Sequence, residues 1–388
     1  MLTAKWTAIG RRLAVRGRSD RPPASLGQVR HRQIVAPLAA TALAGAAVVA
    51  GVAASRAGRA RRRPDDEPVG PRRREARTAP APAPRKPPPP GAALQCLMLS
   101  QTDAVIARLS ATAGAPDAKT VHSVRKDLKR LRAELLLIED HLGRKRTRRE
   151  ERVLAGVAGA LAQARDAEVM LATLDALIAR HPKRLGHRRG VQRVRRRLVK
   201  ARAGAHSQLE DPLVRAELLG ELLGLRERLA AWDLAACPAG QIEAAYTRLY
   251  RDGRRRWHRA ERGRRGARSM HAWRRQVKSL RYTTEALAAC APDGEPKRLA
   301  KIAARADSLG EVLGDEHDLV VITEWVEGLP RKGGRKQRVG GRTRRELRRH
   351  ARRRRRELRF RALREGERLY GKPPGKAAAA ARASLSRR

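Results

Sequence analysis

Aromatic residues are scarce in this 388-residue chain: they make up 3% of it, and there is a single phenylalanine. Platforms that stack single-stranded bases need more aromatic surface than this. The three cysteines, Cys96, Cys237 and Cys290, lie far apart and form no CxxC pair, which argues against a zinc or dithiol redox site. Acidic residues are outnumbered, with 39 Asp and Glu against 89 Lys and Arg and a net charge of +50. The composition therefore predicts a polyanionic partner, and a phosphate backbone is a better target than bases.

The first 93 residues carry no pattern typical of a folded domain. Residues 1–33 are basic and predicted to be disordered, and residues 55–93 form a Pro/Arg-rich linker. Between them, residues 34–54 ("IVAPLAATALAGAAVVAGVAA") contain no charge over 21 positions, which is long enough to span a bilayer. Because alanine dominates this stretch, its hydrophobic driving force is weak. A transmembrane helix and an Ala-rich tether both stay open as interpretations.

From residue 94 onward, apolar residues recur at helical spacing and strand-like alternation is absent. Breaks such as "TAGAPD", "CPAG" and "APDGEP" separate long helices with short loops. The sequence thus predicts an all-α domain over residues 94–370. The low-complexity ending, residues 371–388, is predicted to be a disordered tail.

One helical segment occurs twice. "VHSVRKDLKRLR" begins at Val121, and "MHAWRRQVKSLR" begins 149 residues later at Met270. When His122 is set over His271, apolar and basic positions coincide along both segments. The matched basic residues are Arg125, Lys126, Lys129 and Arg132 in the first copy, and Arg274, Arg275, Lys278 and Arg281 in the second. The repeat predicts an internal duplication, with two related four-helix bundles at about 94–235 and 240–370.

The basic residues of each copy form one stripe on the helix surface. At 100° per residue, the histidine and its four partners fall within an arc of roughly 120° and extend along about 15 Å of helix. Most charge runs are simply solvated helix faces. Here, however, like charges three, four and seven residues apart destabilise the helix, and the stripe itself contains no acidic residue to relieve them. The same costly array appears twice, which favours a phosphate-binding role.

A second pattern follows each copy, as "LAQARDAEV" from Leu161 and "LGDEHDLVV" from Leu313. In both, a leucine precedes an aspartate by five residues. These aspartates are Asp166 and Asp318, and the residues immediately before them are Arg165 and His317. A carboxylate would repel phosphate, so its expected task is to orient neighbouring cationic side chains.

These paired motifs resemble the conserved histidine α-helical domain, the CHAD family, over roughly residues 94–370. The resemblance implies two four-helix bundles related by a pseudo-twofold axis, a basic surface or cavity between them, and binding of inorganic polyphosphate. Separately from the resemblance, we expect a cytoplasmic location, with association with polyphosphate granules or anchoring to a membrane through residues 34–54 as alternatives. Carried over by residue, the family's histidines correspond to His122 and His271, and its aspartates to Asp166 and Asp318. The family's basic positions correspond to Arg125, Lys129, Arg132, Arg274, Lys278 and Arg281.

Further candidates come from position alone. Arg165 and His317 adjoin the aspartates, and Arg251 and Arg254 precede the second motif, close to Tyr246 and Tyr250. We expect an imidazole at His122 and at His271 to donate to a phosphate oxygen.

Three functions remain at this point. The first is polyphosphate binding without catalysis, with no cofactor and no metal. The second is hydrolysis of polyphosphate or triphosphate, for which the sequence shows neither a P-loop nor the Glu-x-Glu-x-Lys motif of the triphosphatases that accompany CHAD in some proteins. The third is non-specific nucleic-acid binding, which the charge permits although no recognised motif appears. Residues 34–54 add a membrane as a candidate partner.

Overall fold

The computed structural model describes residues 88–111, 114, 116–207, 211–263, 265–291, 297–330 and 339–386, all within one compact unit, Ala81–Arg388. No strand occurs in these ranges, so the prediction of an all-α fold is confirmed. The first-half helices are α2 (Pro90–Ser110), α3 (Ala118–Glu134), α4 (Glu139–Leu142), α5 (Arg144–Ala160), α6 (Ala162–Arg180), α7 (Arg189–Ser207) and α8 (Pro212–Ala230). The second-half helices are α9 (Ala239–Glu261), α10 (Ala267–Ala289), α11 (Lys297–Gly328), α12 (Gly341–Tyr370) and α13 (Pro374–Leu385). A 3-10 turn, η1 (Leu135–Leu137), and a π-helical turn, η2 (Pro182–Gly186), complete the list.

The predictions for the N-terminal region fall mostly outside the described residues. The structure does not describe residues 1–33, residues 34–54 or most of the linker at 55–93. Helix α2 begins at Pro90, four residues before the predicted start of the domain, with a proline in its first turn where no backbone donor is required. In the described ranges, no helix combines the length and the apolar character needed to cross a bilayer.

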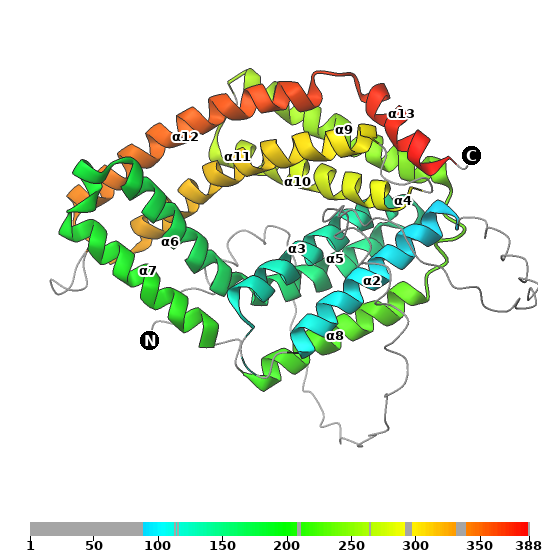
Figure 1. Cartoon of the computed structure of the whole chain (residues 1–388), viewed down its shortest axis with the longest axis horizontal. Coiled ribbons are helices and arrows are strands. Elements are labelled where there is room, and N and C mark those ends of the chain that lie inside the picture. Colours follow the sequence, from blue (N-terminus) through cyan, green and yellow to red (C-terminus); the bar gives the residue numbers. More distant parts are fainter. Residues whose placement is uncertain are drawn as a thin grey trace, which may run out of the picture. The chain divides into compact units, whose positions relative to one another are not determined.

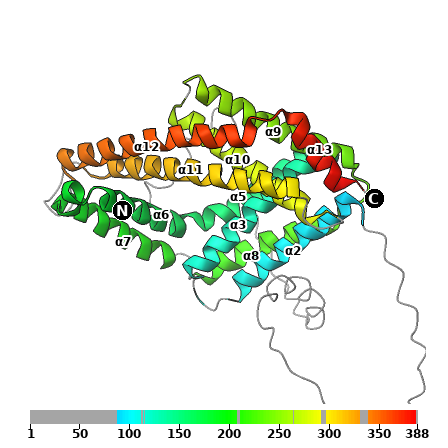
Figure 2. The ribbon, with the colours of Figure 1, turned by 45° about the horizontal axis from the view of Figure 1, so that its top comes forward.

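Helix α10 lies at the centre of the helical packing. It packs against α9 and α11 of its own half and against α3 of the other half (Figure 1). Helix α12 runs beside α11, as Figure 2 shows, and also contacts α9. The two repeated segments, α3 and α10, are therefore direct neighbours.

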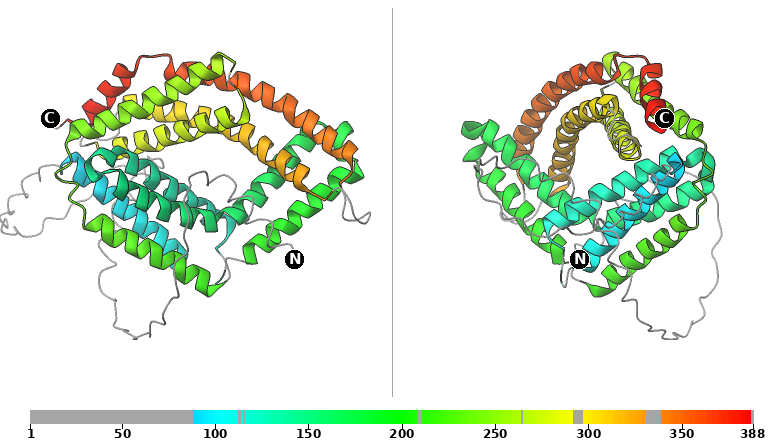
Figure 3. Two further views of the ribbon diagram at one scale, coloured as in Figure 1. Left: turned by 180° about the vertical axis from the view of Figure 1, so that it is seen from behind. Right: turned by 45° about the vertical axis from the view of Figure 1, so that its right-hand side comes forward.

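The first-half helices split into two groups. Helices α2, α3, α5 and α8 pack on one another, whereas α6 pairs with α7 and reaches across to α11 (Figure 3). The contact between α6 and α11 brings together the two segments that carry the second sequence pattern. The packing thus joins both parts of the motif from both halves.

The apolar positions of the repeat form the core that fixes α3 and α10. On α3, which Asp117 caps by accepting a hydrogen bond from the Thr120 amide at 2.7 Å, every matched apolar residue is at most 1% exposed. On α10 the matched residues are at most 2% exposed. These residues are Val121, Val124, Leu128 and Leu131 on α3, and Met270, Trp273, Val277 and Leu280 on α10. The predicted apolar seam is confirmed, and it sets the rotation of both basic stripes.

The prediction of a disordered tail at residues 371–388 was wrong for most of that segment. Residues 374–385 form helix α13, which begins with a proline in its first turn and packs against α9. Its alanines supply a buried face through Ala377, Ala380 and Ala381, with Leu385 at the end. An alanine-rich composition suits a helix in close contact with another helix, and low complexity alone did not reveal this packing.

Candidate anion-binding cavity

The basic stripes of α3 and α10 meet at a cavity of about 850 Å³. Helices α3, α6, α10 and α11 supply its walls. The charged and histidine side chains that line it are His122, Arg125, Lys126, Lys129, Asp166, Arg274, Lys278, Arg281, Asp307, Glu311, Asp315, His317 and Asp318. Cations from both copies of the repeat, 149 residues apart in the chain, therefore share one site.

The stripe on α3 is divided between the cavity and the outer surface. His122, Arg125, Lys126 and Lys129 line the cavity. Arg132, in the same predicted stripe, does not: its guanidinium donates to Glu151 on α5 at 2.8 Å. The structure thus separates Arg132 from the other members of its stripe.

The stripe on α10 is divided in a similar way. Arg274, Lys278 and Arg281 line the cavity, whereas Arg275 does not. His271 is not among the lining residues, but its ring contacts the ring of His317 on α11 at a centroid distance of 4.5 Å. Because His317 does line the cavity, His271 contacts the site through another imidazole.

Three further positions were predicted from the sequence. The side chain of Arg165 lies outside the described residues. Arg251 is exposed and does not line the cavity. Arg254 is also outside the cavity lining, and its Nε donates to the Tyr370 carbonyl at 3.0 Å, which ties α9 to the end of α12.

Asp166 and Asp318 both line the cavity, from α6 and α11 respectively. An Asp166 oxygen lies 3.8 Å from the Arg125 guanidinium, which also donates to the Ala158 carbonyl at 2.9 Å. Asp318 acts on α10 electrostatically, because its negative charge favours the protonated forms of Arg274 and Lys278. Each aspartate therefore adjoins cations of its own half.

Helix α11 carries a row of carboxylates, of which only Asp318 was anticipated from the sequence. Asp307, Glu311, Asp315 and Asp318 are spaced by four, four and three residues, so they share one helix face, and all line the cavity. Arg281 contacts Asp307 and also donates from Nε to Glu285 at 2.6 Å. Each stripe lacks an acid of its own, but acids from α6 and α11 face the cations. Among the described residues, six Lys and Arg side chains and five carboxylates line the cavity.

Burial and crowding reduce the charge of the basic wall. Burial first, and then the positive charges of Arg274 and Lys129, lower the pKa of the Lys278 ammonium to about 7. Burial and the cations Arg274 and Lys278, together with His271, lower the pKa of His317 to about 4. The pKa of His271 is lowered in the same direction, chiefly by burial and then by Arg275 and Arg274. The basic wall therefore carries less positive charge near pH 8 than its residue composition suggests.

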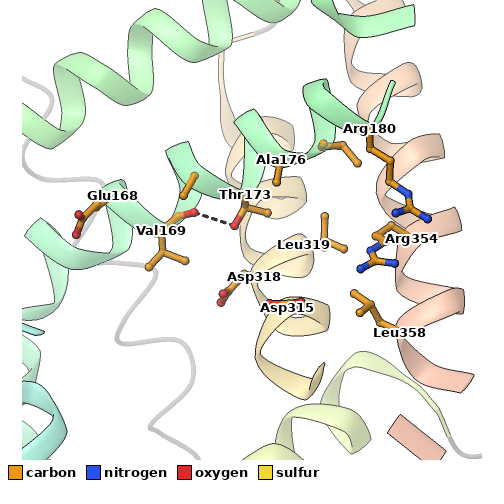
Figure 4. Close-up of a pocket in the computed structure, with 12 residues that line it drawn as sticks. Glu168, Val169, Thr173, Ala176, Arg180, Asp315, Asp318, Leu319, Arg354 and Leu358 are labelled. Carbon is orange, nitrogen blue, oxygen red and sulfur yellow. Dashed lines mark hydrogen bonds between the residues drawn. The ribbon is translucent and has the colours of Figure 1, made fainter. Parts of the chain in front are cut away.

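A second, smaller pocket of about 410 Å³ adjoins the cavity and shares Val169, Asp315 and Asp318 with it. Figure 4 shows its apolar floor between α6, α11 and α12, with Asp315 and Asp318 on one side and Arg180 and Arg354 on the other. Both arginines donate to Glu357, at 2.7 and 3.2 Å. Both guanidinium groups of this smaller pocket are therefore paired with a carboxylate. Among the described residues, no group of three or more His, Cys, Asp or Glu side chains could hold a metal ion.

The model of the CHAD domain family matches residues 96–327, which is more than half of the chain. The chain therefore belongs to the CHAD domain family, as the paired motifs predicted. Among solved structures it resembles PptA from Streptomyces chartreusis, with 17% sequence identity and a TM-score of 0.52, over 73% of this chain and 100% of that chain. At this identity the likeness supports the fold alone. No curated protein matches the chain.

Proposed function

We propose that this protein binds inorganic polyphosphate in the cavity between α3 and α10, without catalysing its hydrolysis. The observation that carries the proposal is the convergence of both basic stripes on a single cavity. Membership of the CHAD family supports a polyphosphate-related ligand. A flexible chain of phosphates, free of bases, suits a site whose described walls offer closely spaced cations and, besides two imidazoles, a single aromatic ring, that of Tyr282.

Phosphate groups would contact the α3 and α10 walls, because the carboxylates of α11 repel them from the opposite side. The cavity would therefore have a basic side that binds phosphate and an acidic side that repels it, unlike a uniformly basic surface. Asp166 and Asp307 would each hold an arginine, Arg125 and Arg281 respectively, in a fixed orientation toward the ligand. Lys126, Lys129, Arg274 and Lys278 would then supply the most direct cationic contacts.

We further propose that the site arose by internal duplication of the chain. Segments α3 with α6 and α10 with α11 carry the two-part motif in the same order, and all four helices line the cavity. Two halves related in this way would each contribute one basic helix and one acid-bearing helix. A pseudo-twofold arrangement of the halves follows from the same reasoning.

Hydrolysis of polyphosphate or triphosphate is the second candidate, and one observation favours it. The carboxylate row on α11 faces the cations, and phosphoryl transfer combines phosphate-binding cations with acids that hold Mg²⁺. We favour binding because Asp166 and Asp307 are engaged by arginines, which lowers their capacity as metal ligands. Non-specific binding of duplex nucleic acid would have to use the outer surface, because the cavity has the size of a small-ligand pocket.

A titration with long polyphosphate and with duplex DNA of equal phosphate content, at several salt concentrations, tests the proposal. We expect polyphosphate to bind more tightly at every salt concentration, because it can enter the cavity and DNA cannot. Equal affinity and equal salt dependence for the two polymers would instead support non-specific binding to the +50 charge of the chain.

A further inference from the structure

Lys278 lies among three other cations that line the cavity. Arg274 precedes it by one turn on α10, Arg281 follows by one turn, and Lys129 faces it from α3. Asp318 on α11 supplies the opposing negative charge. Among the residues that the structure describes, no carboxylate oxygen lies within 4.0 Å of the Lys278 ammonium. Within the described part of the chain, this ammonium therefore interacts with three cations and one aspartate and has no close ion pair.

This crowding can be relieved at a lysine but not at an arginine. The guanidinium groups of Arg274 and Arg281 keep their protons at any physiological pH. The Lys278 ammonium can lose its proton, and burial together with Arg274 and Lys129 brings its pKa to about 7. In the absence of an anion, a large part of the protein therefore carries a neutral amine at this position near pH 8.

Burial and neighbouring cations also disfavour the protonated forms of the histidine pair next to Lys278. The rings of His271 and His317 lie 4.5 Å apart, and the Nδ1 atom of His271 is buried without a hydrogen-bond partner. The charged groups around the pair are Arg274, Arg275 and Lys278 on α10 and Arg355 on α12. Both rings are neutral at pH 7 in the empty cavity, so the local positive charge is lower than the sequence suggests.

We propose that polyphosphate binding is coupled to the uptake of a proton by the Lys278 amine, so that affinity falls as the pH rises above neutrality. This inference rests on the proposed function and names a regulation of the same site. The Nζ lone pair accepts a proton from the solvent, and the resulting ammonium donates up to three hydrogen bonds to phosphate oxygens. The negative ligand offsets both the burial and the repulsion that favour the neutral amine.

The size of the effect follows from linkage. If the bound ammonium no longer titrates below pH 9, the affinity follows the protonated fraction of Lys278 in the free protein. With a free-state pKa of about 7, that fraction falls about tenfold between pH 6 and pH 8, and about tenfold again between pH 8 and pH 9. The histidines extend the dependence below pH 6.5, where a bound polyanion favours their protonation.

The test is isothermal titration calorimetry of the full chain with long polyphosphate at pH 6, 7, 8 and 9 and constant ionic strength. At pH 8 the titration is repeated in two buffers of different ionisation enthalpy, which gives the number of protons taken up. We expect close to one proton for each binding event, and the tenfold losses of affinity given above.

Variants assign the proton to its group. Lys278→Arg keeps the positive charge but cannot titrate, so its affinity should stay nearly constant from pH 7 to pH 9 without proton uptake. Lys278→Met removes the charge and should bind more weakly, again with a flat profile over this range. Lys145→Arg makes the same lysine-to-arginine change at an exposed position on α5, outside the cavity lining, and should keep the wild-type pH profile.

The outcomes separate this inference from the function it rests on. Tight binding of polyphosphate with no proton uptake and no pH dependence would refute the coupling and leave the proposed function standing. Proton uptake that persists in both Lys278 variants would assign it to another group and overturn the role of Lys278. An absence of polyphosphate binding at every pH would refute the proposed function itself.

Discussion

The clearest structural contrast within the basic stripes is between Lys129 and Arg132. The two residues stand three positions apart on α3, and both belong to the arc that the sequence assigns to phosphate. Lys129 lines the cavity, whereas Arg132 does not and donates to Glu151 on α5. A double variant, Lys129→Ala with Lys278→Ala, removes one cavity cation from each copy of the repeat. The matched control, Arg132→Ala with Arg275→Ala, also removes one cation from each copy, but outside the cavity lining.

The expected magnitude comes from the number of cavity cations. In the part of the chain that the structure describes, six Lys and Arg side chains line the cavity. At about 0.7 released counterions for each phosphate contact, their log–log salt slope is about −4, and removing two contacts leaves about −3. Between 50 and 200 mM salt, the wild-type protein should then lose about 300-fold in affinity and the cavity variant about 50-fold. The control variant should follow the wild type.

The assay is a polyphosphate titration at pH 6, where Lys278 carries its proton, at four salt concentrations. Alanine has the best helix propensity, so circular dichroism should show unchanged helix content in both variants. The cavity variant should also bind more weakly than the control at every salt concentration. If the two double variants lose the same affinity and the same slope, binding depends on total charge, and the assignment to the cavity is wrong.

Three further outcomes are expected. Glu134 is 1% exposed and accepts a hydrogen bond from Gln101, and burial raises the pKa of its carboxyl to about 7. This carboxyl therefore contributes stability below pH 4.5 that is lost as the pH rises through 7. In chemical denaturation, Glu134→Gln should therefore be more stable than wild type by about 2–3 kcal/mol at pH 8 and by a smaller amount at pH 5. An equal difference in stability at both pH values would contradict this prediction. Gly366→Ala should lower the free energy of unfolding by about 1–3 kcal/mol, because the new Cβ would lie 2.5 Å from Trp257 and 2.9 Å from Trp273; an unchanged denaturation midpoint would disprove this close packing. Purified protein with Mg²⁺ or Mn²⁺ should release no phosphate from polyphosphate or nucleoside triphosphates, and release that follows the protein through purification would favour the hydrolase.

The apolar seam of the repeat could be predicted because it depends on helix geometry alone. Val121, Val124 and Leu128 fall on one side of α3 at 100° per residue, and burial of that side places Lys129 on another. The sequence did not reveal that Arg132 is drawn away from its stripe, because Glu151 belongs to α5 and reaches it only through tertiary packing. Position on a helix surface predicts a face, and the neighbouring helix decides which residues of that face enter a cavity.

The carboxylate row on α11 is a second feature that the sequence predicts only in part. The spacing of Asp307, Glu311 and Asp315 in α11 is visible in the sequence and indicates one helix face. What that face meets depends on the packing of α11 against α10 and α6, which no local pattern specifies. The low pKa of Lys278 is likewise a property of the assembled cavity, because Lys129 comes from a different helix.

The location of bound polyphosphate tests the central claim most directly, and lysine protection measures it. The protein is treated with an amine-modifying reagent with and without long polyphosphate, and modification at each lysine is quantified by mass spectrometry. Lys126, Lys129 and Lys278 line the cavity, whereas Lys145 and Lys183 are exposed elsewhere. We predict strong protection of the three cavity lysines and little change at the other two. Protection of Lys145 and Lys183 with unchanged modification of the cavity lysines would contradict binding in the cavity.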